Sequence, residues 1–286
     1  MTINSQAREW VAQARQVLEN PTEPGLKMLD PAAFPLHVGV DLGTAYTVLL
    51  VLDHSGQPVA GSYRFAQVVR DGLVVDFIGA VDLLREMKAQ VEERLGAELT
   101  TAWTAYPPGV PQAERRATAH VLQGAGMECL GLVDEPSAAN HVLGLSNGAI
   151  VDVGGGTTGV AVVQDGQVVY TADEPTGGTH FTLTVAGALD LSFDQAERVK
   201  TDLREQERLF PVLRPVMEKV AVITERHIAG YQVPEICLVG GTCLFPRMAE
   251  VVEEVTGIPT RVPLHPLFVT PLGIARTGLA RNGNAS

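Results

Sequence analysis

The sequence predicts an α/β protein whose two related halves follow a short N-terminal helix. Strands and helices alternate from His37 onward, and residues 37–59 (HVGVDLGTAYTVLLVLDHSGQPV) share a plan with residues 148–169 (GAIVDVGGGTTGVAVVQDGQVV). Each copy runs from a strand through an aspartate and a glycine turn with threonine to a second strand and a Gly-Gln hairpin. A repeat with this domain-sized period predicts duplicated domains rather than a solenoid, with Asp41 equivalent to Asp152.

The composition excludes several classes of protein. Of the 286 residues, 45% are hydrophobic and 19% are charged, so the chain can bury a core and does not fit the profile of a disordered protein. The net charge of −12 disfavours the cationic surface that a nucleic-acid partner requires. No segment approaches the roughly 18 apolar residues of a membrane-spanning helix, and the first residues lack the plan of a secretory signal. We therefore expect a cytoplasmic protein without a nucleic-acid partner and without stable membrane insertion.

Residues 1–36 are expected to form an N-terminal helix and a linker. Apolar residues at helical spacing predict an amphipathic helix over Ser5–Glu19, and the prolines that follow predict an irregular linker. Two interpretations of this helix remain open: it docks on the domain that follows, or it serves as a separate targeting element.

The remaining elements divide into two domains and a returning helix. In the first domain, 37–144, helices are expected at 81–95, at 112–123 and from Pro136. A strand entering a turn is expected within 100–109, and a second strand at 129–135. In the second domain, 145–270, we expect a helical stretch over 193–229 that Pro211 and Pro215 could break, a strand at 236–241 and a helix at 246–256. A final helix at 271–279, within the segment 271–286, is expected to return to the first domain.

Both repeats place an aspartate before a turn rich in glycine and hydroxyl residues. Glycine permits close backbone approach and lets successive N–H groups face an anion. If the two halves face each other, their turns could hold a polyphosphate from both sides, and Asp41 and Asp152 would share a cleft. A hydrated Mg²⁺ ion would relieve the repulsion between these carboxylates. The predicted turn residues are Gly43, Thr44 and Ala45 in the first half and Gly154, Gly155, Gly156, Thr157 and Thr158 in the second.

Two further elements have both a functional and a structural interpretation. Gly240, Gly241 and Thr242 lie between an apolar strand and a helix, where bare backbone could lie flat against a nucleoside. Glu135 ends a strand, where its carboxylate could orient an attacking water. Taken alone, the first is a plain strand-to-helix turn and the second an acid that stabilises a helix dipole.

The order of these elements resembles the actin-like ATPases, the superfamily that includes sugar kinases and the seventy-kilodalton heat-shock chaperones. VGVDLGTAYT and IVDVGGGTTGVAVV resemble its two phosphate motifs, CLVGGTCLFPRM its adenosine motif, and LVDEPSAANHVLG and FVTPLGIARTGLA its connecting helices. The resemblance implies an actin-like fold with two ribonuclease-H-like domains and a nucleotide cleft between them. RDGLVVDF and FDQAERVK are similar to the bacterial actin branch, in which positions matching Glu197 and Lys200 approach the ribose and the base.

At closer range the chain resembles the EutJ family of ethanolamine-utilisation proteins. The segments that carry this resemblance include VVRDGLVVDFIGAV, YPPG, ADEPTGGTHFTLTVAG and LFVTPLGIA. The family implies a chaperone-like ATP-binding protein that serves a bacterial microcompartment. It also implies a protein partner among ethanolamine-pathway enzymes or shell proteins, and the N-terminal helix then resembles the tags that load such compartments.

The resemblance assigns roles residue by residue. Asp41 and Asp152 match the aspartates that face magnesium through water, and Glu135 matches the acid linked to the attacking water. The chaperone motif GGGTFDV reads GGGTTGV here, so Gly159 replaces an aspartate, and the chaperones' catalytic lysine has no counterpart. These departures imply ATP and ADP binding with slow hydrolysis.

Two alternatives come from other functional classes. One is a filament-forming or scaffold protein that binds ATP and hydrolyses it slowly. The other is a small-molecule kinase on the same fold, for which Asp71 and Asp76 are the candidate bases, although their segment matches the bacterial actin pattern better.

Overall fold

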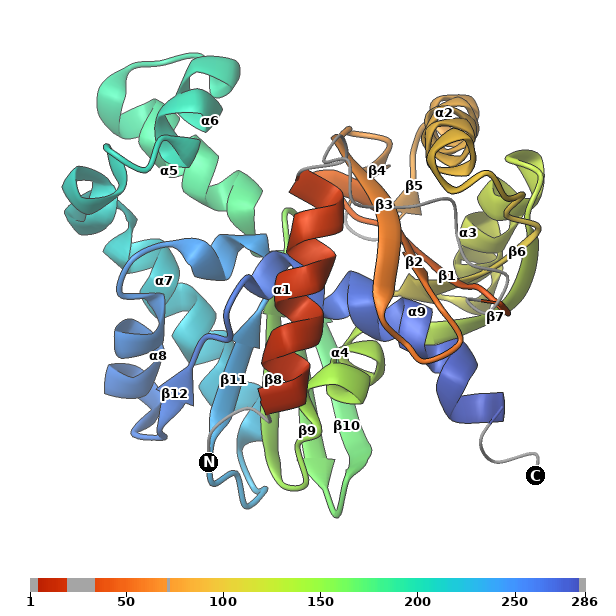
Figure 1. Ribbon diagram of the computed structural model, residues 1–286. Helices are drawn as coiled ribbons and strands as arrows, with labels where there is room; N and C mark the ends of the chain where they lie inside the picture. The colour runs from red at the N-terminus through yellow and green to blue at the C-terminus, as the bar shows by residue number, and fades with distance from the viewer. Residues whose placement is uncertain (1–4, 20–33, 71–72, 283–286) are drawn as a thin grey trace. The chain divides into compact units, whose positions relative to one another are not determined.

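The computed structural model describes residues 5–19, 34–70 and 73–282 and divides the chain into two compact units (Figure 1). Unit 1 contains residues 1–144 and 268–286, and unit 2 contains residues 145–267. Residues 20–33 of the predicted linker, the kinase candidate Asp71 and the tail at 283–286 lie outside the described residues. Among the described helices, none is long and apolar enough to cross a membrane.

Each unit is built on a five-stranded sheet with the same strand order. The order is β3-β2-β1-β6-β7 in unit 1 and β10-β9-β8-β11-β12 in unit 2. The first three strands of each unit pair antiparallel, and the later two join in parallel. Two sheets with one topology are what the sequence repeat predicts, and the α/β fold class is confirmed.

Unit 1 packs helices around its sheet. The larger buried hydrophobic cluster of this unit contains Val40 and Leu42 of β1 together with Leu84 and Met87 of α2. Trp103 and Ala105 of β6 belong to a separate buried cluster with residues of α4 and α9. The elements of unit 1 are α1 (Ser5–Glu19), β1 (His37–Leu42), β2 (Tyr46–Leu52), β3 (Pro58–Phe65), β4 (Val69–Arg70), β5 (Leu73–Val74), α2 (Phe77–Leu95), β6 (Thr101–Tyr106), α3 (Gln112–Gly124), β7 (Glu128–Asp134), α4 (Glu135–Leu143) and α9 (Val269–Asn282).

Unit 2 repeats the sheet and adds a longer helical layer. Val151 and Val153 of β8 pack with Phe181 of α5 and Leu213 of α7 in one buried cluster. The elements are β8 (Gly148–Val153), β9 (Thr158–Gln164), β10 (Gln167–Glu174), α5 (Gly178–Leu189), α6 (Phe193–Thr201), α7 (Gln206–Ile228), β11 (Ile236–Val239), the 3₁₀ turn η2 (Gly241–Leu244), α8 (Met248–Thr256) and β12 (Thr260–Arg261), and the 3₁₀ turn η3 (Pro266–Phe268) leads back to unit 1.

Helix α1 docks on unit 1, beside strand β3 and helix α9 (Figure 1). Its buried face consists of Ala7, Val11, Ala14, Val17 and Leu18. The guanidinium of Arg276 lies 3.4 Å from the centroid of the Trp10 ring, a cation–π contact between α1 and α9. Of the two interpretations that the sequence left open, the structure therefore favours the docked helix.

Several boundaries differ from the sequence prediction: α2 begins at Phe77 and not at 81, and α9 runs over Val269–Asn282 and not 271–279. Two further differences change how the chain is divided. The predicted helical stretch over 193–229 is two helices, and the interruption falls at residues 202–205. Pro211 and Pro215 lie inside α7 without ending it, because its apolar face, including Leu213, is buried in the core. Residues 268–270, assigned to the second domain from sequence, belong to unit 1, where the Phe268 ring packs edge-on against Tyr63 at 5.8 Å.

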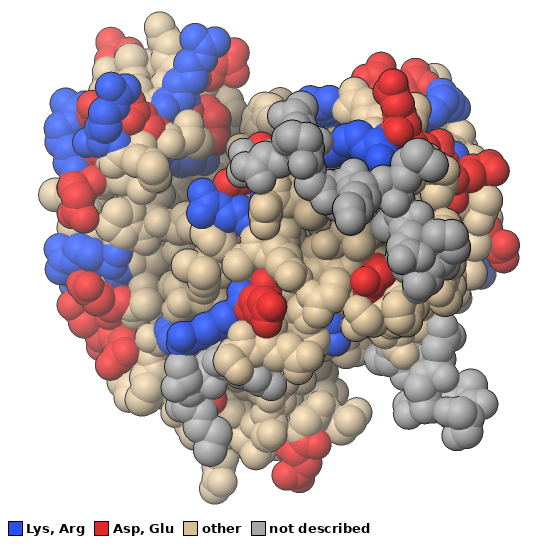
Figure 2. All heavy atoms as spheres, viewed as in Figure 1, with Lys and Arg blue, Asp and Glu red and all other residues tan. Residues whose placement is uncertain are grey.

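The charged surface residues include both signs on the face that Figure 2 shows. Lys and Arg side chains alternate there with Asp and Glu rather than gathering in a separate area. Among the described residues, several charged side chains are paired; Arg214, for example, bonds Glu218 at 2.8 Å and Glu254 at 2.6 Å. A strongly basic face of the kind that binds phosphate backbones does not appear in this view.

Candidate functional site

The first predicted phosphate turn closes between β1 and β2 of unit 1. Asp41 lies near the carboxyl end of β1 and pairs in register with Val48. The Gly43 amide donates to the carbonyl of Tyr46 at 3.0 Å, and the Ala45 carbonyl accepts from the Ala66 amide at 3.0 Å. These bonds hold Gly43, Thr44 and Ala45 in a tight turn, as the sequence predicts.

Glu135 lies at the same edge of that sheet. It is the first residue of α4, directly after β7, and the Asp134 carboxylate caps the helix by accepting from the Ser137 amide at 3.0 Å. Because β1, β6 and β7 run parallel, their carboxyl ends meet at one edge. The structure thus brings Asp41 and Glu135 to a common edge of unit 1, separated by one strand. Asp76, the other kinase candidate, caps α2 by accepting from the Gly79 amide at 2.9 Å.

The second phosphate turn is closed by the same backbone hydrogen bond as the first. The Gly154 amide donates to the Thr157 carbonyl at 3.0 Å, as Gly43 does to Tyr46. Asp152 pairs in register with Gly159 on one side and with Val239 on the other, and it is 9% exposed. The repeat therefore extends from the sequence to the hydrogen bonding of the two turns.

The adenosine-type motif lies directly beside Asp152. Gly240 has φ of 90°, a left-handed conformation that favours glycine. A Cβ at this position would also collide with the Asp152 carboxylate. Bare backbone is thus required at Gly240 for two reasons, and Asp152 is packed against it.

The Gly154 carbonyl joins three segments that are distant in sequence. It accepts from the Gly178 amide at 2.9 Å and from the Thr242 hydroxyl at 2.8 Å. The neighbouring Gly155 carbonyl accepts from the Thr179 amide at 2.7 Å. The turn at 154–158, the start of α5 and the Gly240–Thr242 motif are thereby assembled around one backbone oxygen.

Glu197 and Lys200 reach this assembly from α6. The Lys200 ammonium bonds the Glu197 carboxylate at 2.7 Å, the Thr182 hydroxyl at 2.9 Å and the Gly178 carbonyl at 3.3 Å. Thr182 is fully buried, and its hydroxyl also contacts Glu197 at 2.5 Å. All the predicted segments of unit 2 are therefore linked by hydrogen bonds.

Sequence reasoning missed the start of α5. A Cβ at Gly177 would lie 2.7 Å from the Gly154 carbonyl oxygen and 2.8 Å from the Thr157 amide nitrogen, so only glycine allows this approach. The signal was present as the glycine pair in TGGTH, directly after a strand and at the start of a helix. Thr158, predicted to bind the cofactor, is fully buried and donates its hydroxyl proton to the Thr176 carbonyl.

The site suits a phosphate and a hydrated divalent cation. Gly155 and Gly156 place bare backbone in the turn after β8, and successive glycine amides of this kind can bind phosphate oxygens. Among the described residues, no group of three or more His, Cys, Asp or Glu side chains could hold a metal by itself. Mg²⁺ keeps much of its water shell and takes few carboxylate ligands, so single aspartates such as Asp152 fit its donor preference.

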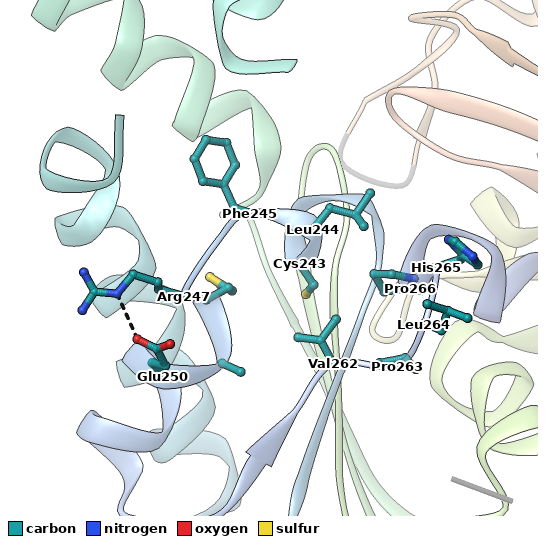
Figure 3. A pocket seen from close by; sticks show the side chains of 12 residues that line it. Cys243, Leu244, Phe245, Arg247, Glu250, Val262, Pro263, Leu264, His265 and Pro266 are labelled. Atoms are coloured by element: carbon teal, nitrogen blue, oxygen red, sulfur yellow. Dashed lines mark hydrogen bonds and ion pairs between the residues drawn. The ribbon is translucent and has the colours of Figure 1, made fainter. Parts of the chain in front are cut away.

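A cavity of about 500 Å³ lies beside η2 (Figure 3). Its lining includes Leu244, Met248, Val262 and Leu264. Burial, with a smaller contribution from the Asp152 charge, raises the pKa of the Cys243 thiol well above its ordinary value. Cys243 is therefore a neutral thiol; it lines the cavity and donates to the Val239 carbonyl at 2.9 Å.

Two family models match parts of the chain. The model of cell division protein FtsA matches residues 149–273, and the MreB/Mbl protein model matches residues 59–193. The chain is also 26% identical to a chaperone protein HscA homolog of Laribacter hongkongensis, covering 79% of this chain and 46% of that protein. A structure of MreB 5 of Spiroplasma citri bound to AMPPNP superposes with a TM-score of 0.72 at 19% identity, over 88% of this chain and 99% of that one. These similarities establish the actin-like ATPase fold.

Similarity to ethanolamine utilization proteins extends over most of the chain. The chain is 43% identical to ethanolamine utilization protein EutJ of Escherichia coli K12 over 245 residues, 85% of this chain and 86% of that protein. The crystal structure of EutJ from Carboxydothermus hydrogenoformans superposes with a TM-score of 0.87 at 44% identity, covering 94% of this chain and 98% of that one. With this identity over this coverage, the chain belongs to the EutJ family of ethanolamine utilization proteins, within the actin-like ATPase superfamily.

Proposed function

We propose that the chain binds Mg·ATP through both of its phosphate turns and hydrolyses it slowly to ADP and phosphate. The observation that carries the proposal is the assembly at the Gly154 carbonyl, which joins two glycine-rich segments and the Gly240–Thr242 motif beside Asp152. The matching turn at Gly43 supports a second, equivalent contribution from unit 1. The AMPPNP bound to the MreB 5 neighbour supports a nucleoside triphosphate as the ligand.

Each predicted residue has a defined role in this proposal. Asp41 and Asp152 would hold the hydration shell of Mg²⁺, which neutralises phosphate charge when bound. Backbone amides of the two turns would bind phosphate oxygens. Glu135 would orient and deprotonate the attacking water, because it lies at the same sheet edge as Asp41. Slow turnover follows from Gly159, which supplies no carboxylate where the chaperone motif has one.

The cellular role we propose is a chaperone-like regulator of ethanolamine utilisation. The family membership supports the pathway, and the similarity to an HscA homolog supports the chaperone-like class. Its partner would be an ethanolamine-pathway enzyme or a microcompartment shell protein, met in the cytoplasm or at the compartment. Nucleotide state would alter the affinity for that partner.

A direct test combines binding and turnover on the full chain. Calorimetric titration with Mg·ATP should show one site, and phosphate release should be slow. Adding ethanolamine ammonia-lyase should raise the rate if that enzyme is the partner. Failure of Mg·ATP to bind would refute the nucleotide proposal.

A scaffold that polymerises on ATP is the second candidate, and the match of residues 59–193 to the MreB/Mbl model favours it. Light scattering after ATP addition distinguishes the two. A rise in scattering would support the scaffold, whereas a constant small particle in every nucleotide state would support the regulator.

A further inference from the structure

The Lys200 ammonium is saturated by groups of its own unit. An ammonium has three N–H donors and no acceptor. Among the described residues, three acceptors lie within hydrogen-bond distance: the Glu197 carboxylate, the Thr182 hydroxyl and the Gly178 carbonyl. The side chain is only 14% exposed. Lys200 therefore has no N–H left for a ligand unless one of these bonds breaks.

The hydroxyl proton of Thr242 is likewise used within unit 2. A hydroxyl has a single proton, and that of Thr242 goes to the Gly154 carbonyl at 2.8 Å. A Cβ at Gly178 would lie 2.9 Å from the Thr242 hydroxyl oxygen, so this hydroxyl also packs against the start of α5. Its contacts are thus with the two backbone segments of the phosphate turn.

These bonds form one continuous path from α6 to the turn. The Lys200 ammonium donates to the Gly178 carbonyl, and the Gly178 amide donates to the Gly154 carbonyl. The Thr242 hydroxyl donates to that same Gly154 oxygen. We propose that Lys200 and Thr242 are positioning residues, an inference that rests on the proposed nucleotide site. They fix the start of α5 against the turn at Gly154 and so act on phosphate binding rather than on the base or the ribose.

A positioning role and a role in contacting the nucleoside predict different effects of substitution on the binding of ATP and of inorganic tripolyphosphate. A residue that contacts the base or ribose affects the binding of ATP and leaves inorganic tripolyphosphate unaffected. A residue that positions the second phosphate turn affects the affinity for both ligands by a similar factor. Inorganic tripolyphosphate therefore serves as the diagnostic probe.

The experiment compares Thr242→Val and Lys200→Met with the wild type, in the full chain with Mg²⁺. Thr242→Val keeps the shape of the side chain and removes the donor, whereas Thr242→Ser keeps the donor and is the matched control. We expect calorimetry to show about five- to tenfold weaker binding of both ATP and tripolyphosphate for Val and Met, the effect of about one hydrogen bond. Thr242→Ser should bind both ligands like the wild type. Weaker ATP binding with unchanged tripolyphosphate binding would overturn the inference.

Hydrogen exchange in the nucleotide-free protein provides an independent measurement. The Gly178 and Thr179 amides donate into the turn, so they should exchange about five- to tenfold faster in Thr242→Val, while amides of β2 stay unchanged. Unchanged exchange at both amides would also overturn the positioning role. If the wild type binds neither ATP nor tripolyphosphate, the proposed function fails, and the exchange rates alone decide the inference.

Discussion

Asp41 and Asp152 occupy equivalent positions in two sheets of the same topology. Asp41 lies opposite Val48 and Asp152 opposite Gly159, and each aspartate precedes a turn closed by a backbone N–H···O hydrogen bond of 3.0 Å. The duplication has thus preserved a carboxylate and a backbone turn together. We expect both aspartates to serve one ligand, and their removal should have the same kind of effect.

Replacing either aspartate with alanine should weaken Mg·ATP binding by about tenfold or more, because the carboxylate that holds the hydrated cation is lost. Calorimetry measures the affinity for Asp41→Ala and Asp152→Ala. Asp165→Asn is the matched control, since Asp165 lies in an exposed turn with φ of 49°, which asparagine also adopts. Unchanged affinity in both alanine variants would contradict the shared site.

Glu135→Gln should slow ATP hydrolysis far more than it weakens binding. A general base contributes about a hundredfold or more to the rate, whereas glutamine preserves the size of the side chain and the start of α4. Single-turnover phosphate release and nucleotide titration separate the two effects. Equal losses of rate and affinity would assign Glu135 a structural role at the helix start.

Gly177→Ala should weaken nucleotide binding and destabilise unit 2 by about 1–3 kcal/mol, because the new methyl group meets backbone atoms of Gly154 and Thr157. Gly187→Ala is the control within the same helix. A Cβ there meets no atom within 4 Å, so alanine should stabilise α5 by up to about 1 kcal/mol. Similar behaviour of the two variants in thermal unfolding would contradict the close approach at Gly177.

Trp10→Ala should lower the stability of unit 1 by about 1–2 kcal/mol, since it removes the stacking of α1 on Arg276. The chain has two tryptophans, Trp10 and Trp103, and both belong to unit 1. The fluorescence of Trp103 during urea unfolding therefore reports this unit in the variant. Glu9→Ala, on the exposed face of α1, should leave the midpoint unchanged. Unchanged stability in Trp10→Ala would favour the targeting interpretation of the helix.

Stability should depend on pH through Glu174. Hydrogen bonds from His227 and Arg226 hold the pKa of the Glu174 carboxyl below its ordinary value of 4.5. A lowered pKa means that the stabilisation is complete above pH 4.5 and disappears as the pH falls below it. The difference in unfolding midpoint between wild type and Glu174→Gln, followed by circular dichroism, should therefore be present at pH 7 and shrink below pH 4.5. A difference that does not change with pH would show that the charge of Glu174 contributes nothing.

The sequence by itself determined the repeat, the strand-turn-strand motifs and most helix boundaries. These features depend on neighbours within a few residues: apolar periodicity, glycine in turns and proline at helix starts. The helix over Ser5–Glu19 was therefore predicted with the bounds that the structure has. The fold class followed in the same way, because two similar segments must form similar sheets.

Tertiary structure alone decided how the segments of unit 2 meet. The bond from Thr242 to Gly154 spans 88 residues, and no local pattern specifies it. The saturation of Lys200 depends likewise on α5 packing against α6, and the continuity of α7 through Pro211 depends on its buried face. Hydrogen bonds and packing between distant segments arise only when the core closes, so they decide which side chains are left for a ligand and which hold the backbone in place.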